Sequence, residues 1–410
     1  MINEPFPLPS LHVLVCCVSK FRWFGVVCGS DTLPLPATVL TMGKVRNKGK
    51  YGLTVKAQSR DGRPGAVGSG TGVDELLELA NSSMNELQFE VAKGFCERVL
   101  QLEPNNIKAL EIMSTVLLEA GDSTSAMEML QKMISLQPDT GFGKYLSMAQ
   151  LSGGKDALRH YSKGATIIQQ QIQEKENCAL EPEPECKDLN RELSSVYCAM
   201  AEVCMTDCCF EEDAETQCLD LIEKGISSDP SNPEALQCKV NFLLVKQQNE
   251  EAKRLMEQSL SLWLPKYQCI RENKTTNQDV DPVDVCPLSY NSRVETSKLL
   301  IELEMYDEAS DVLDGLAEED DEVVDVWYLL GWLNYLRGAE YHGNAHFYLS
   351  KAKEVATKVQ FDDEDERRHI EELLNEIGSV EDDGEEVEED DFGSNSEEEE
   401  ETATTHEMEH

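Results

Sequence analysis

The hydrophobic positions of residues 73–138 recur at the i, i+3 and i+4 spacing that gives a helix one apolar face. Two small residues and a proline occur at equal intervals in this pattern: Ala80, Ala92 and Pro104 stand twelve residues apart. The same arrangement repeats 34 residues later and ends at Pro138. Two short amphipathic helices followed by a proline, repeated with this period, predict an array of paired helices.

A segment near the end of the array carries a more specific signal. The sequence VWYLLGWLNYLRG at 326–338 has a Trp, a Leu three residues later and then a Gly, as at the start of a tetratricopeptide (TPR) repeat. Together with the period, it predicts an all-α fold, a TPR-like α-solenoid of about seven helix pairs over residues 73–378. The amphipathic segment 362–378 is expected to form a capping helix over the last apolar face.

The array is interrupted in two places. Residues 174–186 read EKENCALEPEPEC, which is acidic and contains prolines, so we expect them to loop out. Residues 266–287 form a second polar insertion, after Pro265, which is expected to close the fifth unit. We therefore interpret both segments as insertions into the solenoid rather than as parts of its core.

The segments outside the array differ from it in composition. Residues 1–41 are apolar and Cys-rich, but Glu4 stands where a secretory signal would carry Lys or Arg, so we interpret them as a disordered or artefactual extension. Residues 42–72 form a Gly-rich basic arm that is expected to be disordered, either as a nuclear-import or partner-contacting segment or as a solvated tail. Residues 379–410 form an acidic tail that is also expected to be disordered.

The charge of the chain restricts its partners. The sequence has 79 acidic and 36 basic residues, a formal net charge of −43, and fourteen of the 21 residues at 381–401 are carboxylates. This balance disfavours nucleic acid and anionic membranes and favours a strongly basic protein. The 14 cysteines are interpreted as reduced thiols, and no apolar stretch approaches the roughly 20 residues of a membrane span. The expected locations are therefore the cytoplasm and the nucleus.

Motifs that would indicate catalysis or a cofactor are missing from the sequence. It has no phosphate loop, no HExxH, no GxSxG and no GxGxxG that opens a helix after a strand, so we predict neither an enzyme nor a bound cofactor. His342 and His346 have the i, i+4 spacing of metal ligands but lack an acidic third ligand, so no metal site is expected. The cysteines from Cys198 to Cys209 lack CxxC…CxxC spacing and are interpreted as core and loop residues, with zinc or redox use as the alternative.

The candidate binding site is the concave inner surface of the solenoid, which the first helix of each pair lines in this architecture. Its inward positions, carried over from the repeat register, are Asp74, Leu77, Asn81, Met84, Lys108, Glu111, Thr115, Glu119, Glu234, Gln237, Asn241, Leu244, Asn291, Val294, Lys298, Glu302, Asp325, Tyr328, Trp332 and Tyr335. Their carboxylates would pair with an extended Lys/Arg-rich peptide, and Tyr328, Trp332 and Tyr335 would offer stacking faces to Arg. A clamp for acidic chaperone tails is the alternative, but Leu77 and Ile112 stand where such a clamp needs basic residues.

The acidic tail contains candidate modification sites. Ser394 and Ser396 each precede a Glu by three residues, a pattern that acid-directed kinases favour. Phosphorylation there would add to the negative charge of the tail.

Three features in this order resemble one known family. They are the start GKVRNKGKYG at 43–52, the array that ends in VWYLLGWLNYLRG, and the tail EDDGEEVEEDDFGSNSEEEEE at 381–401. Over residues 42–401 the chain resembles the dedicated assembly chaperones of large-subunit ribosomal protein four in fungi and plants, whereas residues 1–41 have no counterpart. The resemblance implies capture of this newly made basic protein by its long internal loop, and escort to nuclear pre-60S assembly with an import receptor as a further partner.

Two other classes of function remain open on the sequence. The first is a histone chaperone or nuclear-import adaptor for a different basic client. The second is a TPR regulatory subunit of an enzyme. Each would use the same solenoid, so the three readings differ in the partner that the groove holds.

Overall fold

The structure is a computed structural model that describes residues 72–178, 184–272 and 282–378. Within these ranges every regular element is a helix. The predicted segments at 1–41 and 379–410, and all but the last residue of the basic arm, lie outside the described residues.

The helices form consecutive pairs that pack on each other. The pairs are α2 (Val73–Asn85) with α3 (Phe89–Leu102), α4 (Ile107–Glu119) with α5 (Ser123–Leu136), α6 (Gly143–Gln150) with α7 (Gly154–Cys178), α8 (Pro184–Met205) with α9 (Ala214–Ser228), α10 (Pro233–Val245) with α11 (Asn249–Ser261), α14 (Tyr290–Glu302) with α15 (Tyr306–Glu319), and α16 (Val324–Arg337) with α17 (His342–Val359). The remaining elements are α12 (Leu264–Glu272), α13 (Pro282–Val285), the short 3-10 helix η1 (Ala339–Tyr341) and the final helix α18 (Glu364–Ile377). The predicted all-α solenoid of about seven helix pairs with a capping helix is confirmed.

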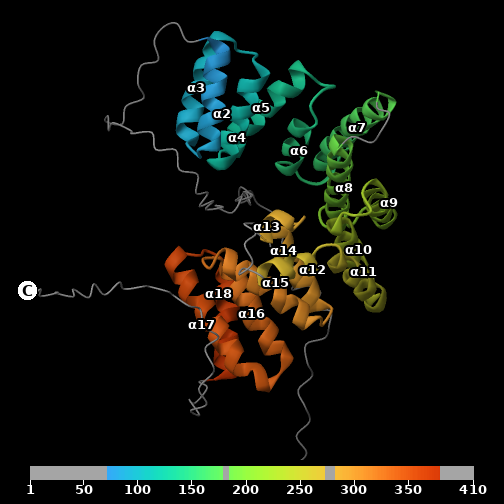
Figure 1. Cartoon of the computed structure of the whole chain (residues 1–410), viewed down its shortest axis with the longest axis vertical. Coiled ribbons are helices and arrows are strands. Elements are labelled where there is room, and N and C mark those ends of the chain that lie inside the picture. The colour runs from blue at the N-terminus through green and yellow to red at the C-terminus, as the bar shows by residue number, and fades with distance from the viewer. Residues whose placement is uncertain (1–71, 179–183, 273–281, 379–410) are drawn as a thin grey trace, which may run out of the picture.

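The first helices of the pairs form one row and the second helices form another. First helices contact the first helix of the next pair, as α8 does with α10, α10 with α14, and α14 with α16. In Figure 1 the pairs follow a curved path, with α8 and α10 on the inner side of the arc and α9 and α11 on the outer side. The first helices therefore line the inside of the arc.

The turn between the two helices of a pair has the same backbone conformation in four units. Gly121 has φ of 77°, and the residues at the equivalent position of other units, Leu87, Gln247 and Glu304, have φ of 56°, 59° and 57°. Glycine adopts this left-handed conformation without steric cost, whereas the other three residues do not. The repeat therefore imposes the turn even where the sequence lacks glycine.

Small residues lie where paired helices cross, as the sequence predicts. Ala80, Ala92 and Ala126 are fully buried at these crossings. A Cβ atom on Gly331 of α16 would lie 2.6 Å from Cγ of Leu349 in α17. A larger side chain at this position would push the two helices apart.

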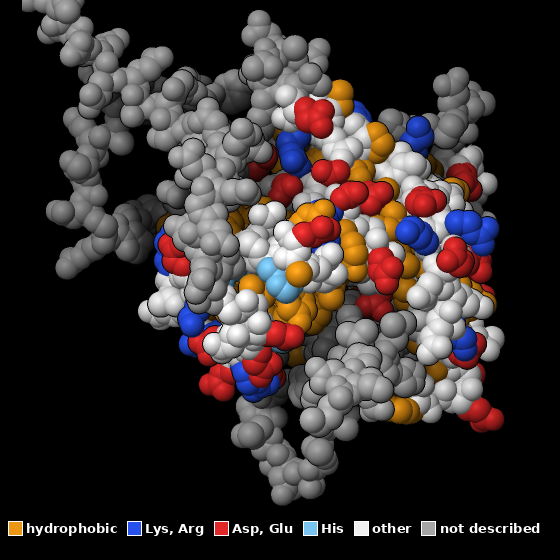
Figure 2. All heavy atoms as spheres, turned by 90° about the horizontal axis from the view of Figure 1, so that it is seen from below, with side chains coloured by type: hydrophobic (Ala, Val, Ile, Leu, Met, Phe, Trp, Pro, Cys, Tyr) orange, Lys and Arg blue, Asp and Glu red, His pale blue; other side chains and the backbone are white. Residues whose placement is uncertain are grey.

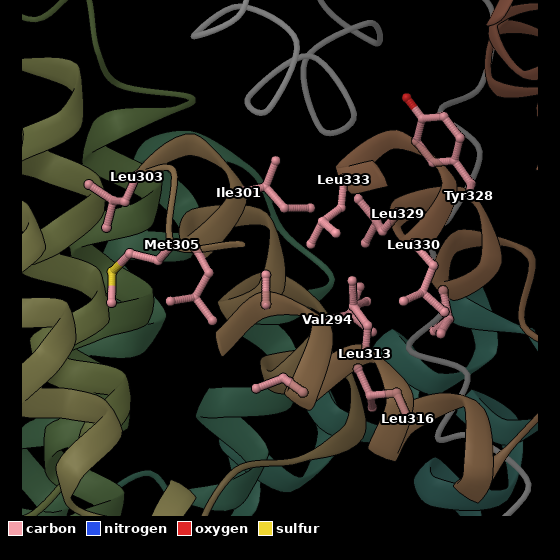
Figure 3. Close-up of a cluster of buried hydrophobic side chains, with 14 of the residues drawn as sticks. Val294, Ile301, Leu303, Met305, Leu313, Leu316, Tyr328, Leu329, Leu330 and Leu333 are labelled. Carbon is pink, nitrogen blue, oxygen red and sulfur yellow. The ribbon is translucent and has the colours of Figure 1, made fainter. Parts of the chain in front are cut away.

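The largest hydrophobic cluster lies in the C-terminal half of the described chain. Figure 3 shows part of it, where Val294 of α14, Leu313 of α15 and Leu330 of α16 lie together in the space between their helices. Side chains from three successive helices thus share one core. This continuity makes the stability of each helix depend on its neighbours.

The segment 174–186 differs from the loop that its composition predicts. Helix α7 continues to Cys178, and helix α8 begins at Pro184, so only residues 179–183 lie outside the described chain. The Glu and Lys residues that made the segment look too polar for a core are good helix formers. A proline is tolerated in the first turn of a helix, where its missing N–H has no helical partner.

The segment 266–287 also differs from its prediction as an insertion outside the core. Most of α12 lies within it, and Pro265 stands in the first turn of this helix instead of ending the fifth unit. Tyr267 of α12 is buried, and Nη1 of Arg271 donates a hydrogen bond of 2.7 Å to the backbone oxygen of Asp311 in α15. Helix α12 is therefore built into the outer row between α11 and α15.

A buried arginine holds this additional helix in place. The side chain of Arg293 in α14 is 1% exposed, and its Nη2 lies 2.6 Å from Oε2 of Glu319 in α15. Its guanidinium carbon lies 5.7 Å from the ring centroids of both Tyr267 and Tyr290. The extra helix thus lies beside α11 in the outer row, while the first helices α10 and α14 stay in direct contact.

Candidate partner-binding groove

The inward positions predicted from the repeat register fall into three groups in the structure. The exposed ones are Asp74, Asn81, Lys108, Glu111, Thr115, Glu119, Asn241 and Asn291. The half-buried ones are Met84, Glu234, Lys298, Glu302, Asp325, Trp332 and Tyr335. The buried ones are Leu77, Gln237, Leu244, Val294 and Tyr328.

The five buried residues are not open groove positions in this structure. Leu77 packs in a hydrophobic cluster with Val99 and Ala109, and Leu244 and Val294 belong to the large C-terminal cluster. Four of the five occupy the second inward position of their unit. Because first helices contact each other at these units, this position points there toward the neighbouring helix, whereas Glu111, the same position of the second unit, is exposed.

Gln237 shows how the inner row is joined by polar contacts. Its Nε2 donates a hydrogen bond of 3.2 Å to Oγ of Ser259, and its Oε1 accepts one of 3.1 Å from Oγ1 of Thr296. These contacts link α10 to α11 and to α14. The side chain therefore fixes the position of one first helix relative to the next.

The centre of the inner row holds two neighbouring carboxylates. Glu234 of α10 accepts a hydrogen bond of 3.1 Å from Ser195 of α8 and one of 2.7 Å from Ser292 of α14. Glu192 in α8 is exposed, and partial burial followed by the charge of Glu234 raises its pKa. Among the described residues, neither carboxylate forms an ion pair with Lys or Arg. The sequence prediction included Glu234 but missed Glu192, because the irregular fourth unit gave no inward register.

The aromatic residues of α16 already have partners within the chain. The Tyr328 hydroxyl lies 2.8 Å from Nδ1 of His369 in α18, and the ring of Trp332 lies 4.4 Å from the same imidazole, between centroids. The ring of Tyr335 stacks on His342 at 5.7 Å with an interplanar angle of 4°. The stacking faces that the sequence predicts for a partner's Arg are therefore partly covered by the chain itself.

Helix α18 extends the inner row by one helix. Burial lowers the pKa of His369, so its imidazole is neutral near pH 7 where it contacts Tyr328 and Trp332. The amphipathic pattern of the capping helix was visible in the sequence. Which of its residues would meet α16 was not, because that depends on how the two helices pack.

A carboxyl pair joins α16 and α18. Glu366 is 2% exposed, and burial followed by the charge of Asp325 and a hydrogen bond with it raises the pKa of Glu366 to about 9. Asp363 raises this pKa further and Lys298 lowers it. Near pH 7 Glu366 is therefore protonated, and Asp325 is held within the chain by this contact.

Metal, redox and membrane chemistry have no geometric support in the described residues. No group of three or more His, Cys, Asp or Glu side chains there could hold a metal ion, and His342 and His346 belong to no such group. Burial raises the pKa of Cys204 to about 11 and of Cys218 to about 12, which keeps both as unreactive thiols. None of the helices that the structure describes is long and apolar enough to cross a membrane.

One exposed face of the protein is acidic and partly apolar. Figure 2 shows Asp and Glu side chains spread across its described part, next to exposed apolar side chains. At the exposed inward positions, Asp74, Glu111 and Glu119 outnumber the one basic residue, Lys108. The arrangement suits a partner that brings positive charge to an acidic and partly apolar surface.

Comparison with known proteins agrees with the resemblance seen in the sequence. No protein-family model matches the chain. A probable assembly chaperone of rpl4 from Schizosaccharomyces pombe is 34% identical over 339 residues, which are 77% of this chain and 94% of the relative. A probable assembly chaperone of rpl4 from Emericella nidulans is 25% identical over 355 residues, which are 77% of this chain and 84% of the relative.

A solved structure gives the same result. The structure of residues 1–338 of the assembly chaperone of RpL4 is 31% identical and covers 66% of this chain and 98% of its own, with a TM-score of 0.55. The chain therefore aligns with these relatives over most of their length, and its helical solenoid resembles the solved structure. The chain belongs to the family of assembly chaperones of rpl4.

Proposed function

We propose that this protein is a dedicated chaperone that binds a newly made basic ribosomal protein of the rpl4 type and delivers it to large-subunit assembly. The support is the alignment over 94% of a relative with that name, together with the acidic inner row. A basic ribosomal protein without its RNA exposes unneutralised charge and aggregates. The role proposed here is binding and release, without a catalysed reaction.

The observation that carries the proposal is the pair Glu192 and Glu234. Glu192 is exposed at the surface, and the packing around it together with the neighbouring Glu234 carboxylate raises its pKa, so its charged form carries a penalty beside Glu234. A Lys or Arg side chain of a partner would remove this penalty, because an opposite charge nearby stabilises the carboxylate. The centre of the inner row therefore favours a basic segment over a neutral or acidic one.

The test compares inner and outer charges of equal number. In the full chain, Glu192→Gln with Glu234→Gln removes the inner pair, and Glu250→Gln with Glu257→Gln removes two exposed carboxylates of α11 in the outer row. We expect the inner variant to bind the rpl4-type ribosomal protein roughly tenfold more weakly by titration calorimetry, and the outer variant to bind as the unchanged chain does. Failure of the unchanged chain to bind this protein, or equal binding of core histones, would overturn the proposal.

We further propose that the protein works in both the cytoplasm and the nucleus. The basic arm at 42–72 is the candidate segment for an import receptor, because clustered Lys and Arg are what such receptors bind. Imaging of the fluorescent full chain with and without residues 42–72 tests this. Equal nuclear signal of both forms would refute the role of the arm.

A further inference from the structure

A shallow, mostly apolar pocket lies where the turns of the first two helix pairs come together. Leu87, Phe89 and Val91 line it from the turn and the start of α3, and Glu119 and Ala120 line it from the end of α4. Its volume is about 400 Å³. Leu87 is 64% exposed and Val91 is 46% exposed, so the apolar side chains are open to solvent.

The backbone of Leu87 makes its exposure unusual. Leu87 has φ of 56°, in the left-handed region that disfavours residues with a large side chain. The equivalent turn of the second unit has Gly121, which relieves this strain, and those of the fifth and sixth units have the polar residues Gln247 and Glu304. The first unit thus keeps an apolar side chain in a strained and solvated position, where glycine would be free of strain. Because the repeat imposes this backbone conformation, the distinctive feature of the first unit is the apolar side chain that it exposes there.

Carboxylates surround the apolar side chains of the pocket. Glu90 and Glu119 line it directly, and Oε2 of Glu86 accepts a hydrogen bond of 2.8 Å from Nε2 of Gln88, which also lines it. None of the described residues that line the pocket is basic. The pocket therefore suits an apolar side chain that is flanked by Lys or Arg.

The pocket continues the inner surface of the solenoid. Glu119 both lines the pocket and occupies the last inward position of α4. Met84, half-buried at the last inward position of α2, precedes Leu87 by three residues. A polypeptide that runs along the inner surface would reach the pocket where α2 and α4 end.

We propose that this pocket anchors an apolar side chain of the client's basic segment where that segment leaves the groove. The inference rests on the proposed function and adds a sequence requirement to it, an apolar residue between Lys or Arg residues. The groove would select for charge along its length, and the pocket would set the register of the client chain. Apolar anchors in partly desolvated pockets commonly dominate the affinity of such interfaces.

The test uses a substitution that the fold tolerates. In the full chain, Leu87→Gly removes the apolar side chain and relieves the backbone strain, and Gln247→Gly makes the same backbone change at the equivalent turn of the fifth unit. Peptides from the basic segments of the rpl4-type ribosomal protein serve as probes, each also made with its apolar residues replaced by Ser. We expect Leu87→Gly to weaken binding of the unchanged peptide roughly five- to tenfold, Gln247→Gly to leave it unchanged, and both variants to bind the Ser peptide alike.

The outcomes separate this inference from the proposed function. If Leu87→Gly binds the unchanged peptide as the natural chain does, the pocket is not an anchor, although the proposed function stands. If the natural chain binds no basic peptide and no rpl4-type protein, the proposed function itself fails. If sedimentation shows that the natural chain self-associates and that Leu87→Gly abolishes this, the occupant is a second copy and the inference is wrong.

Discussion

The buried carboxyl group of Glu366 should make the capping helix depend on pH. Its pKa is raised from 4.5 to about 9, by burial first and by Asp325 second. Between these values the folded chain holds a proton that the unfolded chain releases. The stability of α18 against opening should therefore fall by about 1.4 kcal/mol per pH unit as pH rises through this window. At this slope, the stability of α18 against opening is about 3 kcal/mol lower at pH 7 than at pH 4.5.

The substitution Glu366→Gln removes this dependence without changing the shape of the side chain. Glutamine is neutral at every pH and can still donate a hydrogen bond to Asp325. The variant should match the unchanged chain below about pH 4, where Glu366 is protonated in both folded and unfolded states. Near pH 7 its α18 should be more stable by about 3 kcal/mol, and the advantage should continue to grow toward pH 9.

Amide hydrogen exchange measured by mass spectrometry on peptides from α18 is the appropriate assay, because the last helix of a solenoid opens locally. Comparing the two proteins at the same pH cancels the intrinsic pH dependence of exchange. The protection ratio should rise about tenfold per pH unit between pH 5 and 8. Glu371→Gln, an exposed change on the same helix, is the control. A protection ratio for Glu366→Gln that stays constant with pH would refute the reasoning.

Three further predictions concern packing, the buried arginine and the tail. Gly331→Ala places a Cβ 2.6 Å from a leucine of α17 and should lower the unfolding free energy by about 1–3 kcal/mol in urea titrations, whereas Gly343→Ala, with no atom within 4 Å, should not; equal effects would contradict the packing argument. Glu319→Ala leaves the guanidinium of Arg293 buried without its carboxylate and should cost about 3 kcal/mol by the same measurement, and a loss below 1 kcal/mol would show that the pair is not structural. Deletion of residues 381–401 should slow association with the basic client in stopped-flow experiments at low salt but not at high salt, and an unchanged rate at low salt would exclude electrostatic steering by the tail.

The proposed binding surface was predicted only in part. The repeat register placed Glu234 and Glu119 on the inner side, where the structure finds them half-buried and exposed. It also selected Val294 and Tyr328, which are buried where α14, α16 and α18 pack on one another, and Glu111, which is exposed at the same position of its unit. Sequence spacing gives the face of a helix but not the distance to the next helix, so it could not separate these two outcomes.

The second predicted insertion, residues 266–287, was also predicted only in part. Trp263, Leu264 and Tyr267 are apolar residues at helical spacing just before and within the second insertion, and the structure buries all three. The surrounding polar residues hid this short signal, and the buried Arg293 that packs on Tyr267 comes from another helix. The composition of a segment alone therefore gave a wrong answer for α12.

The sequence by itself determined the helical period, the small residues at helix crossings, the capping helix and the acidic character of the chain, because each depends on residues close together along the chain. Only the tertiary structure decided the rest. It built α12 into the outer row, covered Tyr328 and Trp332 with His369, paired Glu366 with Asp325, and exposed Leu87 in a strained turn. These features arise from contacts between separate helices, and local spacing does not specify how those helices approach one another.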